Sequence, residues 1–138
     1  MSQISERLLK SANHVGELAS GSLLIKHNAY YPWFMIVPHG EFKELIDLPR
    51  DLQLALLDDM NCLSRFILSQ LPEFQKVNLG AIGNVVPQFH LHVVGRHEND
   101  PAWPGPVWGH PEKRAYAEQE LERLVNQLET HLPGFKPV

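Results

Sequence analysis

Residues 88–94 carry the clearest chemical signal in the chain, because two histidines alternate there with apolar residues in the order Gln-Phe-His-Leu-His-Val-Val. Successive side chains of a β-strand point to opposite faces, so Gln88, His90 and His92 would share one face while the apolar residues pack on a helix. A polar group buried without a hydrogen-bond partner costs about 1–3 kcal/mol. We therefore expect the polar row to line a solvent-filled pocket.

Three kinds of surface fit two alternating imidazoles, and the simplest is an exposed sheet face without a function. Metal binding is a second interpretation, because a His-x-His pair places two side chains about 7 Å apart along a strand, where they can converge on one ion. Glu98, His97 or His110 would then supply further ligands in a cupin-like barrel. The two long helices that the sequence predicts fit such a barrel poorly.

Covalent catalysis at phosphorus is the third interpretation. A neutral imidazole is a good nucleophile at about neutral pH. A second imidazole beside it can hold the phosphate oxygens while negative charge develops on them. This chemistry requires neither a metal nor a cofactor.

Residues 88–94 resemble the His-φ-His-φ-His-φ-φ motif of the histidine-triad (HIT) superfamily, with Gln88 in place of the first histidine. Residues 33–38 resemble the family's apolar strand that ends in proline, and residues 78–80 resemble its Asn-x-Gly strand. Residues 100–108 are similar to a tail of bacterial members whose motif begins with glutamine. These segments occur in the family's order between residues 22 and 109.

The resemblance implies a role for each residue of the motif. His90 takes the middle position, whose nitrogen attacks the α-phosphorus of a nucleotide and forms a nucleotidyl-histidine that water then hydrolyses. His92 takes the third position and would hydrogen-bond the phosphate oxygens. Gln88 is the departure, because an amide cannot exchange a proton at neutral pH and so cannot act as a general acid.

The implied activity is that of a nucleotide hydrolase or nucleotidyl transferase. Its substrate would be a nucleoside phosphoramidate or a dinucleoside polyphosphate such as a diadenosine polyphosphate. We expect a bell-shaped pH profile, with His90 unprotonated and His92 protonated. Two alternatives remain open: a nucleotide-binding module with little turnover, and the metal-dependent cupin-like enzyme.

Three asparagines are candidate nucleotide-binding residues by the same resemblance. Asn28 lies near the position of a ribose-binding residue, although a turn asparagine explains it equally well. Asn78 resembles the family's phosphate-side asparagine, and strand-end hydrogen bonding is its alternative. Asn84 precedes the motif in a polar turn, where ordinary hairpin chemistry is sufficient.

The pattern along the chain predicts an α+β fold. Apolar runs predict strands over residues 22–27 and 33–37, which can form a hairpin, and an antiparallel pair over residues 76–82 and 89–94. Helical spacing of leucines predicts helices over residues 48–71 and 111–132. The resemblance implies an antiparallel sheet of about five strands with two main helices, and a homodimer.

Composition limits the partners. The 138 residues fit one domain over residues 1–138, and the formal charge of −4 argues against a polymeric nucleic acid. A small anionic ligand remains possible, because a few N–H groups make a locally positive pocket. The sequence has no run of eighteen apolar residues and no signal-peptide pattern at its start, so we expect a cytoplasmic protein without a membrane partner.

Overall fold

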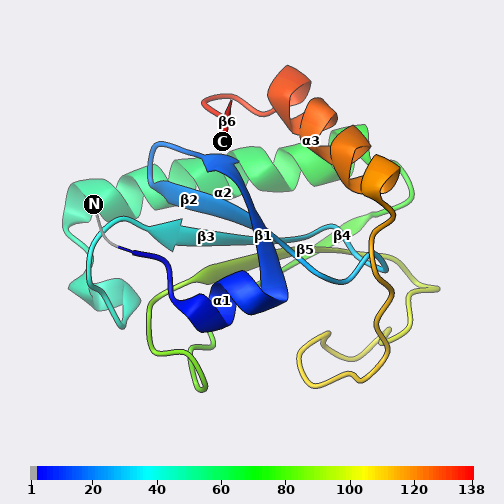
Figure 1. Cartoon of the computed structure of the whole chain (residues 1–138), viewed down its shortest axis with the longest axis horizontal. Helices are drawn as coiled ribbons and strands as arrows, with labels where there is room; N and C mark the ends of the chain where they lie inside the picture. The colour runs from blue at the N-terminus through cyan, green and yellow to red at the C-terminus, as the bar shows by residue number, and fades with distance from the viewer. Residues whose placement is uncertain (1–2) are drawn as a thin grey trace.

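A six-stranded antiparallel sheet lies at the centre of the fold (Figure 1) in a computed structural model that describes residues 3–138. The strand order across the sheet is β4-β5-β3-β2-β1-β6. In chain order the elements are α1 (Glu6–Ser11), β1 (Ala12–Glu17), β2 (Gly21–Lys26), β3 (Trp33–Pro38), the 3-10 helix η1 (Leu45–Asp47), α2 (Arg50–Gln70), β4 (Lys76–Gly80), β5 (Leu91–Arg96), α3 (Glu118–His131) and β6 (Lys136–Pro137). Within residues 3–138, no helix is both long and apolar enough to cross a membrane.

Strand β3 is the innermost part of the fold, because all six of its residues are buried and it pairs antiparallel with β2 on one side and β5 on the other. Alternation directs Phe34 and Ile36 to one face of the sheet, and Trp33, Met35 and Val37 to the opposite face. The strand that the apolar run over residues 33–37 predicts is confirmed.

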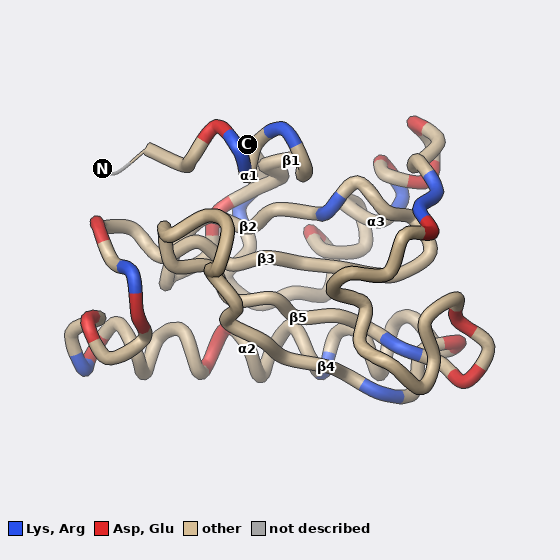
Figure 2. The backbone as a smooth tube through the Cα atoms, turned by 90° about the horizontal axis from the view of Figure 1, so that it is seen from below, with Lys and Arg blue, Asp and Glu red and all other residues tan. Residues whose placement is uncertain are grey.

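Helices α2 and α3 cover the face that carries Phe34 and Ile36. Figure 2 shows α2 and α1 on opposite sides of the sheet. The two long helices contribute to one apolar core, with the buried side chains Leu56, Leu63, Phe66, Ile67, Leu124 and Leu128. Each fully buried aliphatic side chain contributes about 1.5–3 kcal/mol, so this face is built for stability and contains no candidate catalytic group.

The opposite face of the sheet is covered only at its two ends. Helix α1 packs at one end, where Leu8 contacts an apolar cluster that includes Met35 of β3. The connection from β5 to α3 packs at the other end, where Val107 and Trp108 cluster with Trp33. The uncovered stretch between these two coverings is where polar side chains of the sheet can meet a ligand.

Most of the predicted framework is confirmed. The α+β class, the hairpin of β2 with β3, the antiparallel pairing of β4 with β5 and the helix α2 all agree with the sequence-based expectation. The sheet has six strands rather than about five, because β1 and the two-residue β6 extend it on one side. Strand β1 has no simple polar-apolar alternation, and its pairing with β2 is interrupted by an irregularity between His14 and Gly16.

Three predicted boundaries are wrong. Strand β4 ends at residue 80 rather than 82, because its last pair with β5 is that of Gly80 with His92. Strand β5 begins at residue 91 rather than 89, because the N–H of Phe89 donates to the carbonyl of Phe42 at 2.8 Å instead of joining the ladder. Helix α3 begins at residue 118 rather than 111. The N–H of Ala29 donates to the carbonyl of Arg114 at 2.6 Å, so the preceding segment lies along the turn after β2 and cannot yet be helical.

The connection after β5 is anchored by a buried ion pair. Arg96 is only 1% exposed, and its guanidinium donates to both carboxylate oxygens of Asp100 at 2.7 and 2.9 Å. It also donates to the carbonyl of Gly105 at 2.8 Å and to Oδ1 of Asn78 at 2.8 Å. A paired guanidinium that satisfies four acceptors fixes the path of this connection and so determines where Trp108 lies.

Candidate functional site

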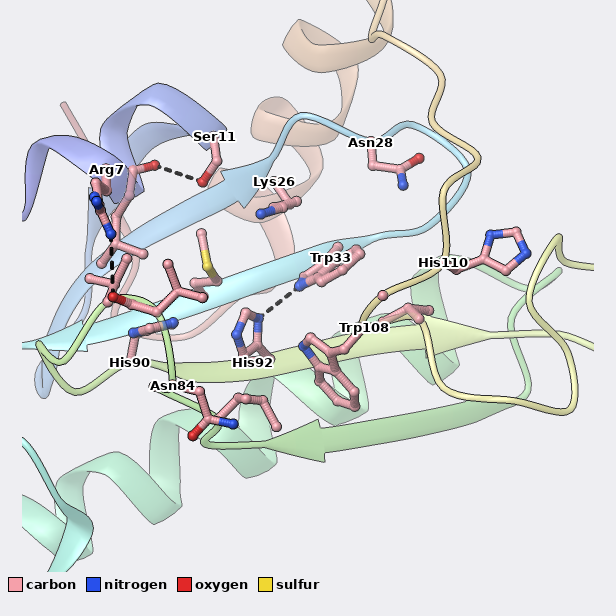
Figure 3. A pocket seen from close by; sticks show the side chains of 18 of the residues that line it. Arg7, Ser11, Lys26, Asn28, Trp33, Asn84, His90, His92, Trp108 and His110 are labelled. Atoms are coloured by element: carbon pink, nitrogen blue, oxygen red, sulfur yellow. Dashed lines mark hydrogen bonds between the residues drawn. The ribbon is translucent and has the colours of Figure 1, made fainter.

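A pocket of about 790 Å³ opens on the partly covered face of the sheet (Figure 3). Its floor comes from β2, β3 and β5. Its walls come from α1, from the turn over residues 82–86 and from residues 107–111 with Lys113. His90 and His92 both line it, so the structure brings together the two histidines that the sequence singled out. A volume of this size fits a mononucleotide-sized ligand.

His90 lies directly before β5, and its side chain is held by the main chain. Its Nδ1 is 2.8 Å from the carbonyl oxygen of Gln88. A carbonyl oxygen only accepts hydrogen bonds, so Nδ1 carries the ring proton and the neutral ring has its lone pair on Nε2. The His90 ring also contacts the His92 ring edge-to-face, and the two ring centroids are 5.0 Å apart. His90 therefore presents a nucleophilic nitrogen.

His92 lies among aromatic rings and is 5% exposed. The indole N–H of Trp33 donates to its Nδ1 at 2.9 Å, and both Trp33 and Trp108 approach it edge-to-face. Burial lowers the pKa of His92 to about 3, with smaller contributions in the same direction from the neighbouring His90 and Lys26. The ring is neutral at physiological pH.

Gln88 does not line the pocket. Its Oε1 accepts the N–H of Ser5 at 2.7 Å, and its Nε2 donates to the carbonyl of Gln3 at 2.9 Å. The side chain therefore attaches the segment before α1 to the motif. This position differs from the sequence-based expectation, which placed Gln88 in one row with His90 and His92.

The three candidate asparagines occupy different environments. Asn84 lines the pocket near His90 and is exposed. Asn28 also lines it, but its Oδ1 accepts the N–H groups of Tyr30 at 3.2 Å and Arg114 at 3.4 Å, as the turn alternative predicted. Asn78 lies outside the lining, and its Oδ1 accepts from Arg96.

Basic residues that the sequence did not single out also line the pocket. They are Arg7 of α1, Lys26 at the end of β2 and Lys113. No aspartate or glutamate belongs to the lining formed by residues 3–138, although acidic residues outnumber basic ones in the chain. The sequence could have identified Lys26 as a pocket residue, because it lies two residues after Leu24 on β2 and shares the face that points away from the helices. It could not have identified Arg7, because α1 was not predicted.

Trp108 closes the pocket on the side of β4. Its ring lies where a side chain on Gly80 would be, since a Cβ added there would stand 2.9 Å from the indole. Its Nε1 is buried and has no hydrogen-bond partner within residues 3–138. Trp103 lies elsewhere, with its ring 5.7 Å from the guanidinium carbon of Arg96. Only one of the two loop tryptophans therefore contributes to the site.

The metal interpretation lacks structural support. Within residues 3–138, no three side chains of the histidine, cysteine, aspartate and glutamate types are grouped to hold an ion. Of the proposed extra ligands, His97 uses Nδ1 to accept the N–H of Asn99, and its ring packs on Phe74. The open sheet with two helices on one face also excludes the cupin-like barrel.

The arrangement combines a nucleophilic nitrogen, a neutral imidazole and three basic side chains in one pocket. Such a pocket can bind an anionic phosphoryl group and attack it. The positive side chains and the two imidazoles are groups of the lining that can hold a phosphate.

Comparisons with known proteins agree with this geometry. The family model of the HIT domain matches residues 9–99. The crystal structure of a histidine triad protein from Bradyrhizobium japonicum has a TM-score of 0.89 at 32% identity, covering 94% of this chain and 97% of that one. One from Marinobacter aquaeolei has a TM-score of 0.89 at 35% identity, covering 96% of each chain. One from Sinorhizobium meliloti has a TM-score of 0.88 at 31% identity, covering 94% of this chain and 96% of that one. A comparison with curated proteins gave no match.

The position of Gln88 leads to a testable prediction. In Gln88→Leu, the two hydrogen bonds to the segment before α1 are lost, so that segment opens more often and trypsin cleaves after Arg7 about tenfold faster. Gln119→Leu, at an exposed position of α3, is the control. Equal cleavage rates in the two variants would show that Gln88 does not hold the segment.

Proposed function

We propose that this chain, which belongs to the HIT family, is a nucleotide hydrolase or nucleotidyl transferase that acts at an α-phosphate through a nucleotidyl-His90 intermediate. The observation that carries the proposal is the hydrogen bond from Nδ1–H of His90 to the carbonyl of Gln88, which leaves Nε2 as a nucleophile in a pocket that residues 3–138 line with cations and without carboxylates. Family membership supports the reaction class.

The reaction has two displacement steps. The lone pair on Nε2 of His90 forms an N–P bond while the bond from the α-phosphorus to its leaving group breaks, and the leaving group departs with that electron pair. Water, or another acceptor in a transferase reaction, then attacks the phosphorus and releases Nε2. A hydrolysis yields a nucleoside monophosphate. His92 and the cations counter the negative charge that develops on the phosphoryl oxygens.

The position of Gln88 favours one of the two expected substrate classes. An amine leaving from a phosphoramidate needs a proton, and a carboxamide bound to the segment before α1 cannot supply one. A phosphate leaving from a polyphosphate chain departs as an anion without a proton. Arg7, Lys26 and Lys113 suit an anionic chain. We therefore propose dinucleoside polyphosphates as the preferred substrates.

Replacing the nucleophile should abolish the covalent step. In His90→Ala, kcat should fall by about 10⁴-fold or more, while nucleotide affinity changes by no more than about threefold. The measurement is intact-protein mass spectrometry after a rapid quench that avoids acid, with diadenosine tetraphosphate and adenosine phosphoramidate as substrates. Wild type should show a nucleotidyl adduct and His90→Ala none.

His110→Ala is the matched control for that experiment, because His110 is another imidazole of the pocket lining and Figure 3 shows it away from His90. Its adduct should persist. Nucleotide binding by wild type without any adduct or turnover would instead support the alternative, a binding module.

The pH profile should differ from the bell shape expected from the sequence. A pKa of about 3 means that His92 is already neutral at about pH 5 and above, since a base loses its proton when the pH exceeds its pKa. The value of kcat/KM should therefore show no alkaline decrease caused by His92. An alkaline decrease between about pH 7 and 9 that disappears in His92→Gln would contradict this account.

We also propose that the protein is a homodimer. Strand β4 is an edge of the sheet, and within residues 3–138 it pairs only with β5. Beside it lies an apolar hollow of about 300 Å³, where Leu54 and Leu57 of α2 are 51% and 46% exposed. An unpaired strand edge next to exposed leucines favours association with another chain.

Light scattering coupled to size exclusion tests the dimer. Wild type should have twice the chain mass of 15.7 kDa. Leu57→Glu should be monomeric, because a carboxylate would be buried in the interface. Leu9→Glu, on the exposed part of α1, should stay dimeric. A wild-type mass of one chain at micromolar concentration would contradict the proposal.

A further inference from the structure

The hydrogen bond between Trp33 and His92 determines which nitrogen of His92 faces the pocket. Indole N–H is only a donor, so Nδ1 of His92, at 2.9 Å, must accept and cannot carry a proton. A neutral imidazole has one ring proton, and it must then reside on Nε2. His92 therefore presents an N–H donor to the pocket, whereas His90 presents a lone pair.

The sheet register makes this hydrogen bond possible. Strands β3 and β5 pair so that Trp33 stands opposite Val94 and Met35 stands opposite His92. Trp33 and His92 are diagonal neighbours on one face, within reach of a side chain as long as tryptophan. They are 6% and 5% exposed, so little water competes for the acceptor nitrogen.

We propose that Trp33 is a positioning residue that fixes His92 as the Nε2–H tautomer, so that His92 binds phosphoryl oxygens as a neutral donor while His90 attacks. The inference rests on the proposed function for its catalytic consequence. The tautomer itself does not depend on substrate or turnover.

The opposite tautomers of the two histidines suit the chemistry of the pocket. If Nε2 of His92 carried a lone pair, it would repel the phosphoryl oxygens. If His92 were protonated, its positive charge would make the neighbouring nitrogen of His90 less nucleophilic. The carbonyl of Gln88 and the indole of Trp33 instead assign one role to each ring. No proton needs to pass between the rings during the attack.

Trp108 packs against His92 as Trp33 does but makes no hydrogen bond to it. Its ring centroid is 5.4 Å from that of His92, and the Trp33 ring is 5.8 Å away, both edge-to-face. The Nε1 of Trp108 donates to no acceptor within residues 3–138, whereas that of Trp33 donates to His92. Trp108→Phe and Trp33→Phe therefore form a matched pair that separates packing from hydrogen bonding.

The test is long-range ¹H–¹⁵N NMR of the imidazoles in the substrate-free protein. Wild type and Trp108→Phe should show a protonated Nε2 and an unprotonated Nδ1 at His92 from about pH 5 to 9. In Trp33→Phe the two nitrogen shifts should move toward each other, because both tautomers become populated. A scalar coupling across the hydrogen bond between Nε1 of Trp33 and Nδ1 of His92 should be visible in wild type, so the test does not require the variant to fold.

Kinetics then test the catalytic consequence. Trp33→Phe should lower kcat by about 10- to 100-fold with little change in KM. Trp108→Phe should not show a fall in kcat of that size with an unchanged KM. A protonated Nδ1 in wild type, or an unchanged Nε2–H tautomer in Trp33→Phe, would overturn the inference. Failure of the proposed function is distinct, because wild type would then lack turnover while its His92 tautomer remained as stated.

Discussion

The pairing of β3 with β5 is the constraint on which both the stability and the chemistry of this protein depend. One ladder of hydrogen bonds sets the register, and the two-residue period of each strand then sorts every side chain to one face. Phe34, Ile36 and Val93 go to the helices, and Trp33 and His92 go to the pocket. A shift of one residue would bury the histidine under α2 and expose the core, so the apolar face fixes the position of the face that lines the pocket.

The covering of the sheet explains why a pocket exists at all. Two long helices complete one face, but only the short helix α1 and the connection anchored by Arg96 cover the other. The polar side chains between these coverings are partly enclosed and therefore work in a medium of low dielectric constant. Charges act strongly there, which is why burial keeps His92 neutral and why three cations without carboxylates favour an anionic ligand in a protein of net charge −4.

The sequence predicted the framework because its strongest signals are periodic. The alternation around His90 and His92 correctly indicated a pocket, and the apolar run over residues 33–37 correctly indicated the strand β3. Contacts between distant segments were beyond such reasoning. The partner of Trp33 depends on the register of β3 against β5, and the hydrogen bonds of Gln88 depend on a segment more than eighty residues away. Arg7 reaches the pocket from α1, a six-residue helix that is too short to show a helical pattern in the sequence.

We propose that the nucleotidyl group is transferred to His90 before water takes it, and the stereochemistry at phosphorus tests this order of steps most directly. Each in-line displacement inverts the configuration, so two successive displacements restore it. The measurement uses a dinucleoside polyphosphate with a chiral α-phosphorothioate, hydrolysed in ¹⁸O-labelled water, with the configuration of the product read by ³¹P NMR. The account predicts net retention. Net inversion would show that water attacks the phosphorus directly, with His90 acting on that water instead of forming a bond to the nucleotide.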